Sequence, residues 1–148
     1  MTKIIKNGYP RQQFLFFVAQ DVAEEIRIAV KTVVESIASS RSWQVSAPVF
    51  INSIDHAETR DTDLADETVG GMIEVYSAQG GGLPDNLDAQ ALEEVELLVK
   101  VAQDLSRVHS LEIEFELDGI FVGAINNGCL DKSLEQGLLG EWRANLGA

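Results

Sequence analysis

In this 148-residue chain, the side chains whose type and spacing could support catalysis are carboxylates. Glu112, Glu114 and Glu116 alternate with apolar residues, and two carboxylates can act as general acid and base, as in glycoside hydrolases. That chemistry requires the two groups to lie on either side of a cleft. Alternation instead places all three side chains on one face of a regular strand. We therefore interpret them as part of a binding surface and not as a catalytic pair.

A second acidic segment, residues 55–67, has no apolar periodicity and predicts an exposed loop. Its carboxylates are oxygen ligands of the kind that calcium prefers. The segment lacks the ordered aspartates, central glycine and final glutamate of a calcium loop, and Asp55 and His56 have no metal-site spacing to His109. We expect no metal and no cofactor here. The acids predicted to contact lysines and arginines of a partner protein are Asp61, Asp63, Asp66 and Glu67.

The other candidate motifs each lack an essential member. The glycines at 80–82 lack the Lys-Ser/Thr of a phosphate-binding loop and run into Leu-Pro-Asp. Cys129 has no histidine at a spacing typical of a nucleophile and its base. Ser46 and Ser53 lie in no nucleophile-elbow motif. We predict no catalytic residue and interpret the chain as a protein that is not an enzyme.

The formal net charge of -13 is the strongest global feature of the chain. It argues against binding nucleic acid through phosphates, which needs clustered Lys and Arg, and against docking on anionic membrane lipids. No apolar run approaches the ~20 residues that span a bilayer. A basic protein, a cation or a neutral ligand remains as a partner, and acidity that serves only solubility is an open alternative. The single cysteine excludes an internal disulfide and predicts a cytoplasmic location.

The length fits one globular domain, residues 1–148, with residues 1–11 as a loose arm. Hydropathy and turn signals predict the element order β-α-β-β-α-β-β-α. We therefore expect an α+β fold, with a single mixed or antiparallel sheet covered on one face by two long helices. The first six elements match the ferredoxin-like core, to which a hairpin strand and a C-terminal helix are added.

Several elements carry distinctive signals. Residues 12–19 are almost continuously apolar, which is typical of a central strand covered on both faces. Asp21 is the expected cap of the first helix and Asp131 the expected cap of the last. Pro48 makes the strand at 43–54 an edge strand or a bulged one.

The hairpin at residues 111–125 allows a prediction of register. A two-residue turn at Asp118-Gly119 gives a core face with the pairs Leu117–Ile120, Phe115–Val122 and Ile113–Ala124. The opposite face then holds the pairs Glu116–Phe121, Glu114–Gly123 and Glu112–Ile125. Such a surface suits a basic, partly apolar patch on another protein. The alternative is a solvated face whose two apolar residues are covered by the C-terminal helix or the N-terminal arm.

The block Asp-Gly-x-x-Val-Gly-x-Ile-x-x-Gly-x-x-Asp-x-x-Leu-x-x-Gly-Leu-Leu-x-Glu-Trp, from Asp118 to Trp142, resembles the tail of small bacterial toxin-immunity proteins. These are acidic α+β cytoplasmic proteins encoded beside contact-dependent or secreted toxins. The resemblance implies a stoichiometric inhibitor that binds one cognate, usually basic, toxin domain, such as a nuclease. It transfers no functional residues, because such families share no site motif.

We therefore expect a non-enzymatic protein-binding module, an immunity protein that neutralises a basic bacterial toxin domain. The predicted partner-binding residues are Glu112, Glu114, Glu116 and Phe121, with Asp61, Asp63, Asp66 and Glu67 nearby or as a second patch. One alternative is a small-ligand-binding or enzymatic α+β domain with its pocket between sheet and helices. Another is a self-associating structural protein, in which Phe121 and Ile125 meet a second copy. The sequence leaves the oligomeric state open.

Overall fold

The computed structural model describes residues 9–55, 66–78 and 81–146. Within these residues the strands are β1 (Arg11–Val18), β2 (Ser46–Asp55), β3 (Asp66–Tyr76), β4 (Glu112–Leu117), β5 (Ile120–Asn126) and β6 (Cys129–Leu130). The helices are α1 (Glu24–Ala38), α2 (Asp85–His109), the π-helical segment η2 (Ser133–Gly140) and α3 (Glu141–Asn145), which continues directly from η2.

The described strands form one sheet in the order β2-β3-β1-β4-β5-β6, and each neighbouring pair is antiparallel. With β1 between β3 and β4, the first six elements have the split βαβ arrangement of ferredoxin-like folds. The predicted α+β fold is confirmed, and β5, β6 and the C-terminal helix are its additions. Of the predicted arm, residues 1–8 lie outside the described residues, whereas Arg11 already begins β1.

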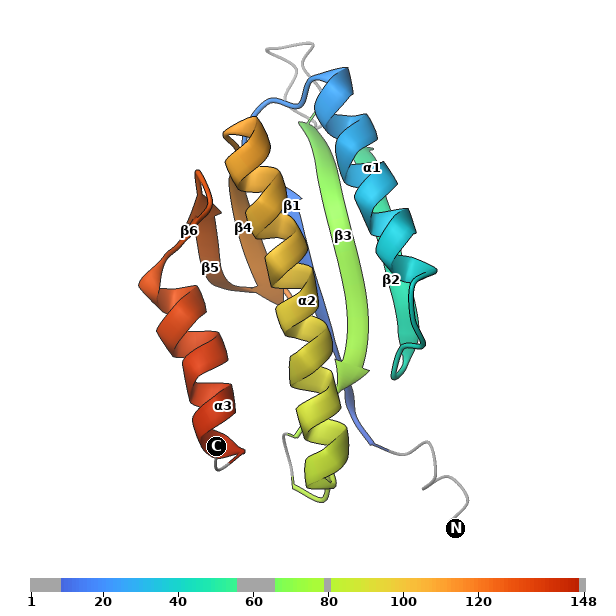
Figure 1. Cartoon of the computed structure of the whole chain (residues 1–148), viewed down its shortest axis with the longest axis vertical. Helices are drawn as coiled ribbons and strands as arrows, with labels where there is room; N and C mark the ends of the chain where they lie inside the picture. The colour runs from blue at the N-terminus through green and yellow to red at the C-terminus, as the bar shows by residue number, and fades with distance from the viewer. Residues whose placement is uncertain (1–8, 56–65, 79–80, 147–148) are drawn as a thin grey trace.

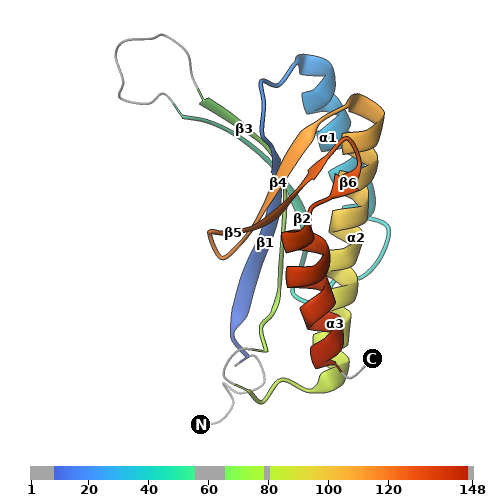
Figure 2. The same ribbon diagram turned by 90° about the vertical axis from the view of Figure 1, so that its left-hand side faces the viewer.

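All the helices lie on the same face of the sheet, as Figures 1 and 2 show from two directions. Phe14, Phe16 and Val18 of β1 are buried beneath them. Leu15 and Phe17 alternate with these residues, lie on the other face and are only half-buried. The prediction that β1 is covered on both faces is therefore wrong for the described residues. The reason is topological, because right-handed crossovers in a split βαβ unit place both helices on one side.

The first helix packs as its periodicity predicts but begins later. Its inner residues Ile26, Val30 and Val34 are buried, whereas α1 begins at Glu24 after Ala23, which makes no side-chain capping bond. The predicted cap at Asp21 is therefore wrong. Carboxylates in the first turn stabilise the helix N-terminus through the helix dipole instead.

Strand β2 is an edge strand of the sheet, as Pro48 predicts. Its pairing with β3 is irregular between Ser46 and Val49, the segment that contains this proline. A proline has no backbone N–H to donate, so a bulged edge is where a strand tolerates one. The prediction is confirmed.

The β4–β5 hairpin has the predicted turn but a shifted register. Asp118 and Gly119 have positive φ angles of 52° and 83°, as a two-residue hairpin turn requires. The pairs nearest the turn are the predicted ones, Leu117–Ile120 and Glu116–Phe121. A bulge at position 122 then changes the pairs farther out to Phe115–Gly123, Glu114–Ala124, Ile113–Ile125 and Glu112–Asn126.

The bulge exchanges two residues between the faces of the sheet. Ile125 is fully buried in the core, so its predicted place on the acidic face is wrong, and Ala124 lies there instead. The backbone explains the shift, because the N–H of Ala124 donates to Oδ2 of Asp131 at 3.0 Å. At Gly123, where φ is 150°, a Cβ would lie 2.6 Å from Cβ of Leu134. Only glycine fits beneath the C-terminal helix here.

Asp131 also begins the C-terminal helix, because its Oδ1 accepts a bond from the backbone N–H of Leu134 at 2.9 Å, so the predicted cap is confirmed. The helix is wound as a π-helix over η2, which buries Leu134 and Leu139, five residues apart. Trp142 on α3 donates its indole N–H to Oδ1 of Asp88 on α2 at 2.8 Å. The helix is therefore fixed at both ends.

Glu94 on α2 is fully buried, unlike its exposed neighbour Glu93. Its Oε2 accepts hydrogen bonds from the backbone N–H of Gln44 at 2.8 Å and from the side chain of Gln90 at 3.2 Å. Its Oε1 has no hydrogen-bond partner among the described residues. Burial raises the pKa of Glu94, and these bonds and Arg41, 3.9 Å away, oppose it only in part.

We expect Gly123→Ala to lower the free energy of unfolding by about 1–3 kcal/mol, since the new methyl group overlaps the backbone of Leu134. Urea unfolding followed by circular dichroism measures the change. Gly137→Ala is the control, because the nearest atom to its new Cβ is 3.9 Å away. The control should change stability by less than about 1 kcal/mol. Equal effects of the two substitutions would contradict the packing of η2 on β5.

We expect Glu94→Gln to become more stabilising, relative to the wild type, as pH rises. A raised pKa in the folded state means that Glu94 stabilises the fold at low pH and that this contribution is lost as pH rises through the folded pKa. Urea unfolding of both proteins over a pH series gives the difference. Glu93→Gln controls for the loss of one charge. A difference that falls with rising pH would contradict the burial of an unsatisfied carboxylate.

Candidate functional site

The face of the sheet that carries no helix is called the open face below. Two rows of its residues, given by the register of the strands, cross the sheet from β2 to β5. The first row is Val49, Met72, Leu15, Glu116 and Phe121. The second row is Ile51, Gly70, Phe17, Glu114 and Ala124.

Both rows change character between β1 and β4. The part on β2, β3 and β1 is apolar, and Val49 at its edge is 51% exposed. The part on β4 is a stripe of glutamates, beyond which Phe121 is 54% exposed. Large apolar side chains that remain accessible beside charged ones are typical of a protein-interaction surface. The open face is therefore the candidate functional site.

Gly70 is needed for the close pairing of β3 with β1 in the middle of the open face. A Cβ at this position would lie 1.8 Å from the carbonyl oxygen of Phe16 on the neighbouring strand. Glycine thus allows β3 to approach β1 closely where the second row crosses them.

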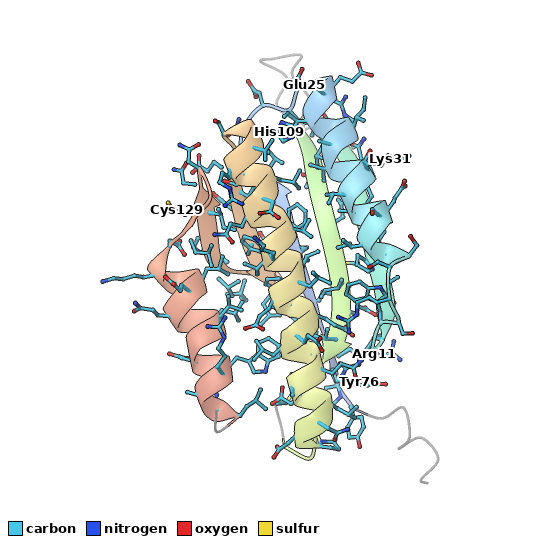
Figure 3. All side chains as sticks on the ribbon, viewed as in Figure 1. Arg11, Glu25, Lys31, Tyr76, His109 and Cys129 are labelled. Atoms are coloured by element: carbon cyan, nitrogen blue, oxygen red, sulfur yellow. The ribbon has the colours of Figure 1, made fainter. Side chains whose placement is uncertain are left out.

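The glutamate stripe keeps its charge available. In the described part of the chain, the carboxylates of Glu112, Glu114 and Glu116 make no ion pair or hydrogen bond. Glu74 on the same face lies 3.8 Å from Arg11, which Figure 3 shows at the end of the sheet near Tyr76. The unpaired negative charge of the open face is therefore concentrated on β4.

The structure brings together half of the predicted partner-binding residues. Glu112, Glu114, Glu116 and Phe121 share the open face. Glu67 lies in β3 on the helix side, where its carboxylate accepts two bonds from Arg27 of α1, at 2.7 and 2.8 Å. These bonds lower the pKa of Glu67 and occupy the carboxylate. Asp66 begins β3, and the remaining two, Asp61 and Asp63, lie outside the described residues.

The described residues offer little support for a metal site or for a histidine–cysteine pair. No group of three or more His, Cys, Asp or Glu residues there could hold a metal ion. His109 at the end of α2 and Cys129 at the start of β6 lie on separate elements, as Figure 3 shows. His56 lies outside the described residues. No helix in the part described is long and apolar enough to cross a membrane.

The helix layer contains a groove of about 380 Å³ beside the C-terminal helix. Its floor is formed by Gln12 of β1 and Leu117 of β4, and its walls include Asp88 of α2 and Glu141 and Trp142 of α3. Figure 1 shows that α2 and α3, which carry these wall residues, run side by side. The sequence alone could not predict this site, because its members come from five elements that only the tertiary fold brings together.

Comparison of this chain with protein-family models, with curated proteins and with solved structures found no match.

Proposed function

We propose that this chain is a non-enzymatic protein-binding module whose open face binds a basic protein. The observation that carries this proposal is the arrangement of the two rows, in which an apolar surface adjoins a stripe of unpaired glutamates. An apolar surface supplies affinity when it is covered, and charges at its edge steer the partner and fix its orientation.

The apolar half of the face favours a partner that covers it permanently or often. Leu15 and Phe17 lie on the central strand, between Met72 and Gly70 on one side and the glutamates on the other. Helices cover the equivalent residues of the other face. Covering such side chains contributes about 25 cal/mol per Å² of apolar area.

The charge favours a basic partner over a second copy of this chain. Two copies would bring together surfaces that each carry three unpaired glutamates, within molecules of formal charge -13. Like charges across an interface oppose association, whereas lysines and arginines on a different protein would neutralise the stripe.

The resemblance of Asp118–Trp142 to bacterial immunity proteins suggests which basic protein this is. We propose the cognate toxin domain of a neighbouring gene, neutralised by stoichiometric binding. The residues of that block also build the hairpin turn, Phe121 and the helix that supports β5, so the resemblance covers part of the open face.

The test uses the basic C-terminal domain of a secreted toxin encoded by the adjacent reading frame. We expect the double variant Glu114→Lys/Glu116→Lys to associate about 10-fold more slowly with this domain, with a weaker dependence of the rate on salt. Biolayer interferometry at low and high salt measures both. The control is Glu25→Lys/Glu135→Lys, which changes net charge equally but at exposed sites on α1 and η2.

Equal rates for the two double variants would show that only overall charge matters and would remove the open face from the proposal. A wild-type chain that sediments as a dimer, and becomes a monomer when Glu114 and Phe121 are replaced, would assign the face to self-association. A neighbouring operon of metabolic enzymes would contradict the immunity role.

Phe121→Ala tests the apolar part of the face separately. Because Phe121 is 54% exposed, we expect its replacement to leave stability nearly unchanged. Dissociation of the toxin domain should become about 10-fold faster or more, while the association rate stays within about twofold of the wild type. Ile120→Ala is the control, since Ile120 is similarly exposed but pairs with Leu117 outside the two rows. A slower association with unchanged dissociation would contradict this assignment.

A further inference from the structure

The groove between α2 and the C-terminal helix lies on the helix side of the sheet, away from the open face. Its volume of about 380 Å³ lies near the lower end of the ~300–1,000 Å³ found for small-molecule sites. Leu117 and Leu138 give it an apolar lining, and polar groups converge on it from three elements. The groove therefore has the composition of a binding site for a small group.

Gln12 gives the most direct sign that this groove takes a ligand. Its residue is 92% buried, since only 8% of its surface is exposed, and it lines the groove. The amide makes no hydrogen bond to any described residue. No nitrogen or oxygen of Gln12 is among the fully buried side-chain atoms of the described residues that lack a partner, so its amide reaches the groove and is open to a ligand there. The adjacent Gln13, on the other face of β1, is exposed.

The charges around the groove select a cation. Asp88 and Glu141 border it, and none of the described residues that line it is Lys, Arg or His. Asp88 uses Oδ1 to hold the indole of Trp142, and no hydrogen bond to a described residue engages the carboxylate of Glu141. An anion would be repelled here, whereas a cation would meet acceptors on separate sides of the groove.

The arrangement of acceptors favours a guanidinium over an ammonium group. A guanidinium is planar and presents five N–H donors in different directions, whereas the three donors of an ammonium group share one nitrogen. A guanidinium is also more weakly hydrated, so it enters a partly apolar groove more readily. Carbonyl oxygens of Gln12 and Asn145 and the carboxylates of Asp88 and Glu141 provide the acceptors.

We propose that this groove is a binding site for a guanidinium group on a short apolar stem, which donates a hydrogen bond to the amide oxygen of Gln12. The group could belong to a free small molecule or to an arginine side chain in a peptide. Binding requires no bond chemistry, and it is independent of the open face because the two sites share no residue.

The experiment titrates the full chain with two probes, agmatine as the free cation and N-acetyl-arginine amide as the peptide-borne one. The indole N–H signals in NMR spectra report the result. We expect the signal of Trp142 to move with saturation and that of Trp43, which donates to the carbonyl of Ala38 outside the groove, to stay. Tighter binding of agmatine assigns the site to a small molecule, and tighter binding of the arginine derivative assigns it to a peptide.

Variants separate a ligand site from a structural role. We expect Gln12→Leu and Glu141→Gln each to weaken binding about 10-fold or more. Gln13→Leu is the matched control and should leave binding unchanged. Glu141 is exposed, so its variant remains informative if Gln12→Leu fails to fold.

Three results would overturn the proposal. One is a Trp142 signal that moves with neither probe. Another is equal binding of a neutral urea analogue of agmatine, which has the same shape without the charge. The third is unchanged affinity in Glu141→Gln.

Discussion

A central strand with large apolar side chains on both faces must be covered twice, and in this chain the helices cover it once. Phe14, Phe16 and Val18 lie beneath α1 and α2, whereas Leu15 and Phe17 on the same strand do not. The split βαβ topology causes this, since both crossovers return on one side of the sheet. The third helix, which could have covered the other face, follows β6 back to the helix side, where Gly123 admits it against β5. The exposure of the open face is therefore a consequence of the connectivity.

The negative charge is divided between structural and unpaired carboxylates. Glu67 accepts two bonds from Arg27 and joins β3 to α1, and Asp131 joins β5 to the C-terminal helix. Asp88 holds Trp142. These acids maintain the fold, whereas the glutamates of β4 take part in no such bond in the described residues. The location of the unpaired acids is therefore more informative about a binding surface than the formal charge of -13.

Local patterns predicted the elements well because each depends on neighbouring residues. Helical spacing identified the buried stripe of α1, Pro48 identified β2 as an edge strand, and Asp118-Gly119 identified the hairpin turn. The register beyond the turn could not be predicted, because it depends on Asp131 and Leu134, which reach β5 only in the folded protein. The burial of Glu94 and the groove at Gln12 could not be predicted for the same reason, because both depend on residues that only the tertiary fold brings together. The glutamates and Phe121 could be placed on one face because they precede the bulge or lie on the partner strand that it leaves regular.

The two outer strands of the sheet limit the addition of strands from other molecules. An outer strand with free backbone groups can pair with another chain, and repeated pairing leads to fibrillar aggregates. At one border β6 is only two residues long, and at the other β2 is interrupted near Pro48, which cannot donate a backbone bond. The border at β6 offers no long template, and at the border formed by β2 the regular pairing is confined to Val49–Asp55. Pairing between copies at either border is thereby disfavoured, so the broad face of the sheet is the surface left for contact with another protein.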